Sequence, residues 1–195
     1  MKSLLIVKPS FALFNSGDRQ FNKMKRIAII GSSGAGKSTL ARSLSKKLKL
    51  PIIHLDAYYW QPGWRETDAK QWLETQQELV KSDRWIIDGT YGSSLDIRLA
   101  AADTIIWLDF NRYLCLSRVL KRYLQYPGKT RSDMAQGCPE RLNLDFFKYV
   151  WDFPRLQRPK IQAKLNKYDR EKQIIILQNP RQVLNLHKRI NPVGE

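Results

Sequence analysis

The sequence is organised around a glycine-rich stretch that stands between a short apolar run and a helical pattern. The apolar residues 27–30 lead directly into GSSGAGKST at residues 31–39, and Leu40, Leu44 and Leu48 follow with the spacing of a helix face. The stretch fits G-x-x-x-x-G-K-[ST], whose glycines let consecutive backbone N–H groups cradle phosphate oxygens at the start of a helix. Because strand, turn and helix come in the order that such a loop requires, the sequence predicts a nucleoside triphosphate site.

Each position of this phosphate loop has an expected role. Lys37 is expected to reach the β- and γ-phosphates of ATP, and the Ser38 hydroxyl to bind Mg²⁺. The residues predicted to bind the nucleotide are Gly31, Ser32, Ser33, Gly34, Ala35, Gly36, Lys37, Ser38 and Thr39. The alternative is a flexible loop that binds nothing, and it leaves the lysine directly after the last glycine unexplained.

Two aspartates follow short apolar runs further along the chain. Asp56 comes after residues 52–55, and Asp88 comes after residues 85–87. In an open α/β sheet, functional groups gather beyond the carboxyl ends of the strands, so both aspartates are expected beside the phosphate loop. Asp56 is predicted to act as a general base or to orient an acceptor hydroxyl, with a helix cap or turn as the alternative. Asp88 is predicted to hold Mg²⁺ directly or through water.

Residues 111–172 form a basic segment that holds fifteen Lys and Arg against six Asp and Glu. Arg118 and Arg122 are one helical turn apart, and Arg131 lies in a stretch that glycines and prolines keep out of a helix. Two helices joined by such a loop are typical of a lid that closes over a transferring phosphate and excludes water. We therefore expect a catalytic role for these three arginines, with a solvated basic hairpin as the alternative.

Two local expectations can be checked directly against a structure. Arg98 is predicted on a short helix within residues 91–101, where it faces either an anionic substrate or solvent. Pro154 and Pro159 are expected to limit helix formation around them, because proline cannot donate a backbone hydrogen bond.

The overall composition narrows the class of protein. A net charge of +16 and a pI near 10.0 fit phosphate-rich partners, either small nucleotides or nucleic acid bound through non-specific charge. No apolar run approaches the ~18 residues needed to cross a membrane. Two separate cysteines, Cys115 and Cys138, indicate reduced thiols in a cytoplasmic protein. We expect a monomer or a homodimer.

With these residues in view, the chain resembles P-loop kinases of the adenylate-kinase-like superfamily, and most closely the bacterial DNA topology modulation proteins, or adenylate-kinase-related kinases. The resemblance covers most of residues 24–190. It is carried by GSSGAGKST at 31–39, HLDAYYWQPGW at 54–64, WIIDGTY at 85–91 and TRSDMAQGCPERLNLDFFKYVWDFP at 130–154. It implies an α/β fold of three layers (α/β/α), with a parallel sheet of about five strands and a helical lid.

The same resemblance implies ATP binding and phosphoryl transfer to a small molecule. Adenylate kinases usually place Phe-Pro-Arg after the aspartate–glycine pair that corresponds to Asp88–Gly89. Here Thr90–Tyr91 follow that pair, which weakens a claim that AMP is the acceptor. The aromatic segment after Asp56 is instead similar to that of uridine kinase and related kinases, in which the aspartate contacts the acceptor hydroxyl.

The sequence thus predicts an N-terminal extension at residues 1–23, before Met24 as a natural start, and a P-loop kinase domain at 24–195 with a lid around 112–145. The predicted function is transfer of the γ-phosphoryl group of Mg-ATP to a nucleotide, nucleoside or other hydroxylated metabolite. The alternative is a nucleic-acid-associated P-loop NTPase, or a regulator of DNA topology, that uses ATP as a switch. No helix-turn-helix, zinc-finger or RNP-type signature supports that alternative.

Overall fold

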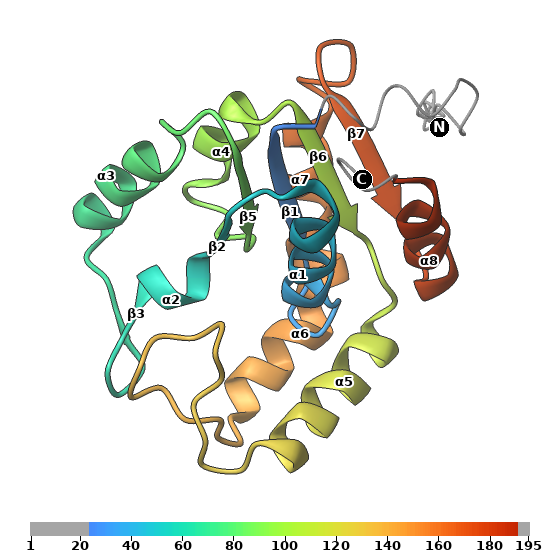
Figure 1. The fold of residues 1–195 in the computed structure, drawn as a ribbon. Coiled ribbons are helices and arrows are strands. Elements are labelled where there is room, and N and C mark those ends of the chain that lie inside the picture. The colour runs from blue at the N-terminus through green and yellow to red at the C-terminus, as the bar shows by residue number, and fades with distance from the viewer. Residues whose placement is uncertain (1–23, 191–195) are drawn as a thin grey trace, which may run out of the picture.

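Short apolar strands alternate with helices along residues 24–190, which are the residues that the computed structural model describes (Figure 1). The predicted extension at residues 1–23 lies outside the described residues. The elements are β1 (Arg26–Gly31), α1 (Lys37–Leu48), β2 (Ile52–His54), α2 (Leu55–Tyr59), β3 (Trp60–Gln61), β4 (Arg65–Glu66), α3 (Ala69–Leu79), β5 (Trp85–Asp88), α4 (Leu95–Ala101), β6 (Thr104–Leu108), α5 (Arg112–Gln125), α6 (Leu144–Leu156), α7 (Arg158–Leu165), β7 (Gln173–Leu177) and α8 (Pro180–Arg189).

Five of the strands form one parallel sheet in the order β2-β5-β1-β6-β7. The central strand β1 pairs with β5 on one side and with β6 on the other, so the loop that follows β1 emerges from the middle of the sheet. The predicted α/β fold, with its five-stranded parallel sheet, is confirmed.

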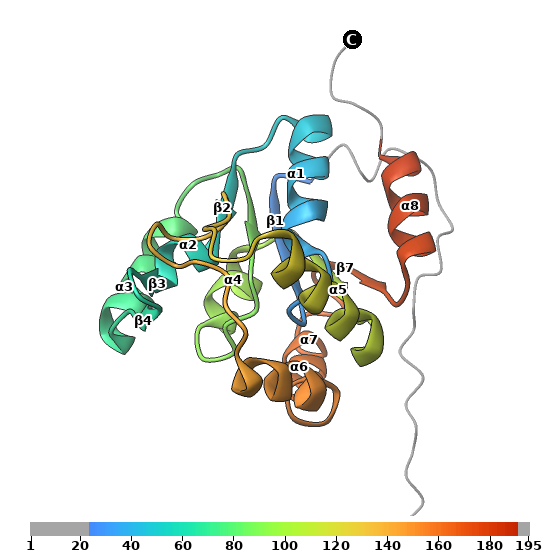
Figure 2. The same ribbon diagram turned by 90° about the horizontal axis from the view of Figure 1, so that it is seen from below.

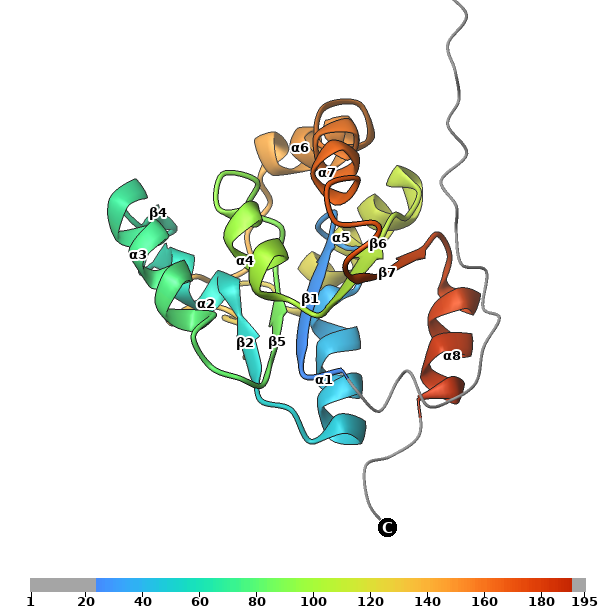
Figure 3. The same ribbon diagram turned by 90° about the horizontal axis from the view of Figure 1, so that it is seen from above.

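Both faces of this sheet are buried, and successive residues of each strand enter different cores. In β1, Ile27 and Ile29 pack in the core that also holds residues of α1, α5 and α8, whereas Ala28 and Ile30 pack in the core that holds residues of α4 and α7. This alternation is the period-two pattern of a strand covered on both sides, and it gives the three layers visible in Figure 3.

The helix α6 corrects one expectation, because it continues through Pro154 to Leu156. Pro154 stands close to the carboxyl end of the helix, so it removes a single backbone hydrogen bond there, while the buried side chains of Val150 and Phe153 anchor the same turns. Pro159 lies in the first turn of α7, where proline is well tolerated. The two helices are therefore separated at Gln157, between the prolines.

The segment predicted as a lid, around residues 112–145, covers α5, the loop 126–143 and the start of α6, and we call the loop 126–143 the lid loop. Figure 2 shows this loop leaving the end of α5, passing close to α2 and β3, and returning to α6. The small antiparallel pair of β3 and β4 pairs Trp60 with Glu66 and Gln61 with Arg65. The loop 126–143 and this hairpin thus lie together beside the carboxyl ends of the central strands. A lid function for this segment remains a prediction.

Candidate functional site

The phosphate loop forms a tight turn between β1 and α1. Gly36 caps the helix with a φ of 98°, and Gly34 has a φ of 80°, both in the left-handed region that favours glycine. At Gly34, an added Cβ would lie 2.3 Å from the backbone oxygen of Cys115 on α5, so the loop packs directly against that helix. The first backbone N–H groups of α1, which have no partners within the helix, therefore face the turn.

Lys37 folds back over this turn. Its Nζ donates to the backbone oxygens of Gly31 at 3.1 Å and of Ser32 at 3.0 Å. Burial lowers the pKa of the Lys37 ammonium, while the nearby carboxylates of Asp56 and Asp88 oppose that shift. The ammonium is thus held at the loop with backbone oxygens as its direct partners, which a phosphate group can replace.

Ser32 gives a second indication that the loop fits a phosphate. Its hydroxyl oxygen is buried and lacks a hydrogen-bond partner of good geometry among the described residues. A buried hydroxyl without a partner is costly, so such a group usually marks a place where a ligand or water completes the bonding. A triphosphate fits this loop for four reasons: the glycines allow a tight turn, α1 begins here, Lys37 supplies a positive charge and the Ser32 hydroxyl can donate a hydrogen bond.

Thr90, which belongs to no recognised sequence motif, ties the phosphate loop to the end of β5. Its Oγ1 donates to the backbone oxygen of Gly31 at 2.6 Å and accepts from the Gly31 N–H at 3.0 Å. Its position directly after Asp88–Gly89 is the only feature of the sequence that could have pointed to this role. Thr90 therefore fixes the starting point of the loop relative to the neighbouring strand.

Asp88 lies at the end of β5 and is 4% exposed. Its Oδ1 is 2.5 Å from Nδ1 of His54, the last residue of β2, because the two strands pair in register at these residues. The hydrogen bond with Asp88 raises the pKa of His54, although burial works against this. His54 was not predicted, since a single histidine at a strand end carries no motif.

The predicted Mg²⁺ ligands can be tested against the chemistry of their neighbourhood. The described residues contain no group of three or more His, Cys, Asp and Glu side chains arranged to enclose a metal. Mg²⁺ usually keeps several waters and takes only one or two protein oxygens beside the phosphates, so the Ser38 hydroxyl and the Asp88 carboxylate fit that mode. Their role as metal ligands stays a prediction.

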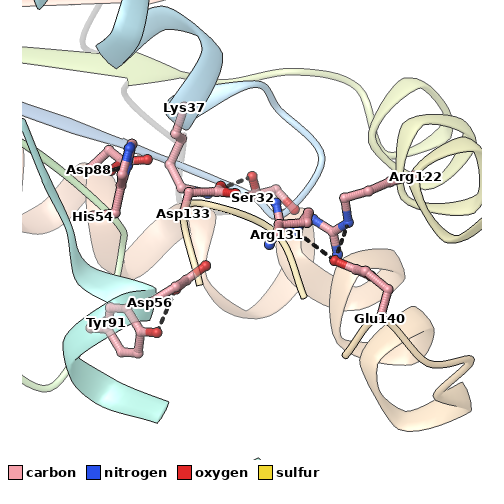
Figure 4. Close-up of polar contacts among 10 residues, drawn as sticks. All are labelled: Ser32, Lys37, His54, Asp56, Asp88, Tyr91, Arg122, Arg131, Asp133 and Glu140. Atoms are coloured by element: carbon pink, nitrogen blue, oxygen red, sulfur yellow. Dashed lines mark hydrogen bonds and ion pairs between the residues drawn. The ribbon is translucent and has the colours of Figure 1, made fainter. Parts of the chain in front are cut away.

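Asp56 lies in the first turn of α2, and Figure 4 shows it in the same site as Lys37. Its Oδ1 accepts a hydrogen bond from the hydroxyl of Tyr91 at 2.5 Å. Tyr91 has a φ of 31°, and its ring lies 4.5 Å from that of Tyr59 and 5.0 Å from that of Trp72. The carboxylate of Asp56, which the sequence predicts to orient the acceptor hydroxyl, is thus held by a tyrosine whose ring packs against two other aromatic rings.

The three predicted lid arginines take up two different environments. Arg118 donates through Nη1 to the backbone oxygen of Ala35 at 3.1 Å, so it lies directly on the phosphate loop. Arg122 of α5 and Arg131 of the lid loop instead form ion pairs with the same oxygen of Glu140, at 3.0 Å and 2.7 Å from their Nε atoms (Figure 4). Glu140 is 6% exposed and was not predicted as a site residue.

A second acid of the lid loop reaches the phosphate loop. Asp133 is buried and accepts from Nη1 of Arg131 at 3.0 Å, and it lies near enough to the Ser38 hydroxyl for that group to affect its pKa. Burial alone would raise the pKa of Asp133, but Arg131 and the Ser38 hydroxyl outweigh it and lower that pKa. Asp133 and Glu140 both lie within residues 130–154, the stretch most specific to the resemblance described above. Their place in that stretch is the only feature of the sequence that could have marked them as site residues.

The lid loop is also bonded to the hairpin of β3 and β4. The Gly63 N–H donates to the oxygen of Gly137 at 2.9 Å, and the indole N–H of Trp64 donates to the oxygen of Pro139 at 3.0 Å. The Cys138 thiol lies 3.2 Å from the oxygen of Gln61. The aromatic segment after Asp56 therefore supports the lid loop in its position over the site.

The prediction that Arg98 faces an anionic substrate or solvent is wrong, because its side chain is buried. It is 1% exposed and donates to the backbone oxygen of Thr90 at 2.6 Å, to the hydroxyl of Ser94 at 3.1 Å and to the side-chain oxygen of Gln76. Five N–H donors in a rigid fork allow one guanidinium to hold the whole turn after β5. Arg98 is thus a structural residue behind the site.

Comparisons with known proteins agree with this architecture. Residues 14–93, less than half of the chain, match a family model described as ABC transporter, and this stretch includes the phosphate loop and Asp88. The uncharacterized protein YqaC of Bacillus subtilis (strain 168) is 31% identical over 107 residues, which are 53% of this chain. The chain spans 60% of the length of that relative.

A solved structure matches over most of the chain. The shikimate kinase from Acinetobacter baumannii in complex with shikimate has a TM-score of 0.58 and 15% sequence identity, covering 89% of this chain and 94% of the other. At this identity the likeness concerns the fold alone. The described residues contain no helix with the length and apolar character that a membrane span requires. The chain thus has the fold of the P-loop NTPases, in the form found in a solved small-molecule kinase.

Proposed function

We propose that the protein is a kinase that transfers the γ-phosphoryl group of ATP to the hydroxyl group of a small molecule. The observation that carries the proposal is the position of Asp56, whose carboxylate is held by the Tyr91 hydroxyl at 2.5 Å in the same site as Lys37 (Figure 4). A carboxylate facing the phosphate-binding lysine is the arrangement that a hydroxyl acceptor needs. The lid loop borders the same space.

The proposed step follows from these positions. The acceptor oxygen attacks the γ-phosphorus, the bond from that phosphorus to the bridging oxygen breaks, and ADP leaves with the bond's electron pair. Asp56 orients the acceptor hydroxyl and accepts its proton, while Tyr91 holds the carboxylate in place. Lys37 and the loop amides, with Arg118 beside them, hold the phosphates in line.

Mg²⁺, when bound, would neutralise charge on the β- and γ-phosphates. Ser38 and Asp88 are the residues proposed to hold it. His54 would keep the Asp88 carboxylate turned toward the site through the bond at 2.5 Å. Arg122 and Arg131 are proposed to close over the transferring group through their terminal nitrogens, since their Nε sides face Glu140. The specific resemblance to DNA topology modulation proteins remains a prediction.

A second candidate is a P-loop ATPase that hydrolyses ATP without a small-molecule acceptor, including one that acts with nucleic acid. The match of residues 14–93 to the ABC transporter model and the net charge of +16 favour it. The products separate the candidates, because a kinase leaves a phosphorylated acceptor and an ATPase leaves inorganic phosphate. The position of Asp56 opposite Lys37 favours the kinase.

The test is an ATP-consumption screen across nucleosides, nucleoside monophosphates, sugars and other hydroxylated metabolites. Lys37→Ala should lower turnover by about 10³-fold or more, because it removes the cation that holds the β- and γ-phosphates. Lys46→Ala, on the exposed far end of α1, is the matched control and should keep wild-type turnover. Full activity of the Lys37→Ala variant would refute the assignment of the site.

A further inference from the structure

The charges on the acceptor side of the site are balanced within the chain itself. Arg122 and Arg131 share the buried carboxylate of Glu140, with one oxygen 3.0 Å and 2.7 Å from the two Nε atoms. Arg131 has a second partner in Asp133, at 3.0 Å. These four side chains, which we call the lid charge cluster, carry two positive and two negative charges and are therefore neutral as a unit.

The remaining charges divide unevenly between the two halves of the site. Lys37 and Arg118 contact backbone oxygens of the phosphate loop at 3.0–3.1 Å, so their charges are available for the donor phosphates. On the acceptor half, Asp56 has the neutral hydroxyl of Tyr91 as its direct partner. Burial, with Asp56 adding to it, raises the pKa of Tyr91 far above its usual range, so this phenol remains a neutral donor.

An anionic acceptor would meet unfavourable charges in this arrangement. It would approach the negative carboxylate of Asp56. Because the terminal nitrogens of Arg122 and Arg131 are proposed to serve the transferring group, a further anion could be neutralised only by drawing both arginines away from Glu140. That movement would leave a buried carboxylate without a partner, which is a costly state. An acceptor without charge needs neither change, because its hydroxyl group is recognised by Asp56 alone.

We propose that the acceptor is an uncharged hydroxyl compound, of the nucleoside, sugar or polyol class, and that Glu140 excludes phosphorylated acceptors by holding Arg122 and Arg131. This inference rests on the proposed kinase function, since it concerns the acceptor half of that site. Glu140 is then a specificity-determining residue. Its removal should release two guanidinium groups toward any phosphate that enters the acceptor half.

The first test measures anion binding and does not require the natural acceptor. The donor site is filled with a non-hydrolysable Mg-ATP analogue, and inorganic phosphate is titrated in by calorimetry. Glu140→Gln should bind this phosphate at least about tenfold more tightly than the wild type, because two paired arginines lose their shared counter-charge. Wild-type binding as tight as that of the variant would overturn the proposal.

Two further variants distinguish the lid charge cluster from general charge effects. Glu78→Gln also removes one negative charge, but from an exposed pair with Lys81, and should leave phosphate binding unchanged. Arg122→Gln combined with Glu140→Gln leaves Arg131 balanced by Asp133, so the gained phosphate binding should disappear. A gain that persists in this double variant would contradict the role assigned to the two arginines.

The second test uses wild-type protein and matched pairs, each a hydroxyl compound and its phosphate monoester, such as a nucleoside and its 5′-monophosphate. Turnover should be confined to the uncharged members. Consumption of a monoester at a kcat/KM equal to that of its partner would overturn the proposal, even if Glu140→Gln failed to fold. If no pair is consumed, the proposed kinase function fails, while the phosphate titration still decides the charge balance.

Discussion

Buried polar side chains fix the turns around the phosphate loop, and the 1% exposed Arg98 lies at the centre of one such group. Its guanidinium satisfies Thr90, Ser94 and Gln76 in a space from which water is excluded. Thr90 in turn bonds Gly31 at the start of the phosphate loop. A structural residue two contacts away from the nucleotide site thus determines where that loop begins.

Replacing Arg98 with lysine should destabilise the protein by about 2–4 kcal/mol, because a lysine ammonium cannot satisfy these separate acceptors and leaves some of them buried without a donor. The free energy of unfolding from urea denaturation measures this. Arg84→Lys, at an exposed arginine, is the control and should change that free energy by less than ~0.5 kcal/mol. Equal stabilities of the two variants would show that the buried bonds contribute little.

The two histidines should titrate on opposite sides of the ordinary pKa of 6.5. The bond to Asp88 raises the pKa of His54, whereas burial, with Lys47 nearby, lowers that of His187. His54 therefore stabilises the fold most below pH 6.5, and this contribution is lost as the pH rises through its raised pKa. Proton NMR titration of the metal-free protein measures both values, with His187→Gln assigning the signals. Two coinciding titrations would contradict the structure.

At the scale of elements, the phosphate loop depends on a close approach that glycine alone permits. Gly34 and Gly63 have nearly the same left-handed φ, 80° and 79°. A Cβ at Gly34 would lie 2.3 Å from the Cys115 oxygen, whereas a Cβ at Gly63 would have no atom within 4 Å. The pair therefore separates the cost of the backbone conformation from the cost of the contact with α5.

Gly63→Ala should cost about 1 kcal/mol, which is the usual penalty of a left-handed alanine. Gly34→Ala should cost at least about 3 kcal/mol and should also weaken nucleotide binding, because α5 and the loop must move apart. Urea denaturation and titration with an ATP analogue measure the two effects. If both variants lost the same stability and bound the nucleotide equally, the loop and α5 would not be packed as described.

The strands of the parallel sheet, the phosphate loop and the positions of Asp56 and Asp88 could be predicted because each depends on residues close together in the sequence, whereas the hairpin of β3 and β4 was not predicted. Apolar runs such as 27–30 and 85–87 indicate buried strands, and parallel strands bring their carboxyl ends to one edge. The partners of these residues could not be predicted. Glu140 meets Arg122, and His54 meets Asp88, through contacts between distant segments for which no local periodicity exists.

The burial of Arg98 escaped prediction for the same reason. A charged residue on a short helix is usually exposed, and only the packing of α3 against α4 brings Gln76 to meet it. The assignment of residues 1–23 as an extension and the bounds of the lid stay predictions. Propensity and spacing therefore define which elements form, while the polar pairs that complete the site depend on how those elements pack.

At the scale of the whole molecule, the net charge of +16 raises the question of nucleic acid. The lid charge cluster shows that part of the basic segment is neutralised locally, and Arg158 is likewise paired with Asp109 at 2.9 Å. The remaining excess should attract any phosphate backbone through counterion release, which does not depend on sequence. We therefore expect DNA binding, if measured, to be an effect of charge that is separate from the nucleotide site.

This expectation gives a prediction with three readouts. Affinity for duplex DNA should fall by about 10²-fold or more between roughly 50 and 200 mM salt and should be equal for duplexes of unrelated sequence. Lys37→Ala disables the phosphate loop but removes only one charge of the excess, so this variant should bind DNA like the wild type. Fluorescence anisotropy with and without Mg-ATP measures all three. Tight, sequence-selective binding that requires ATP and Lys37 would instead favour an ATP-dependent switch on DNA, since charge alone cannot couple the two ligands.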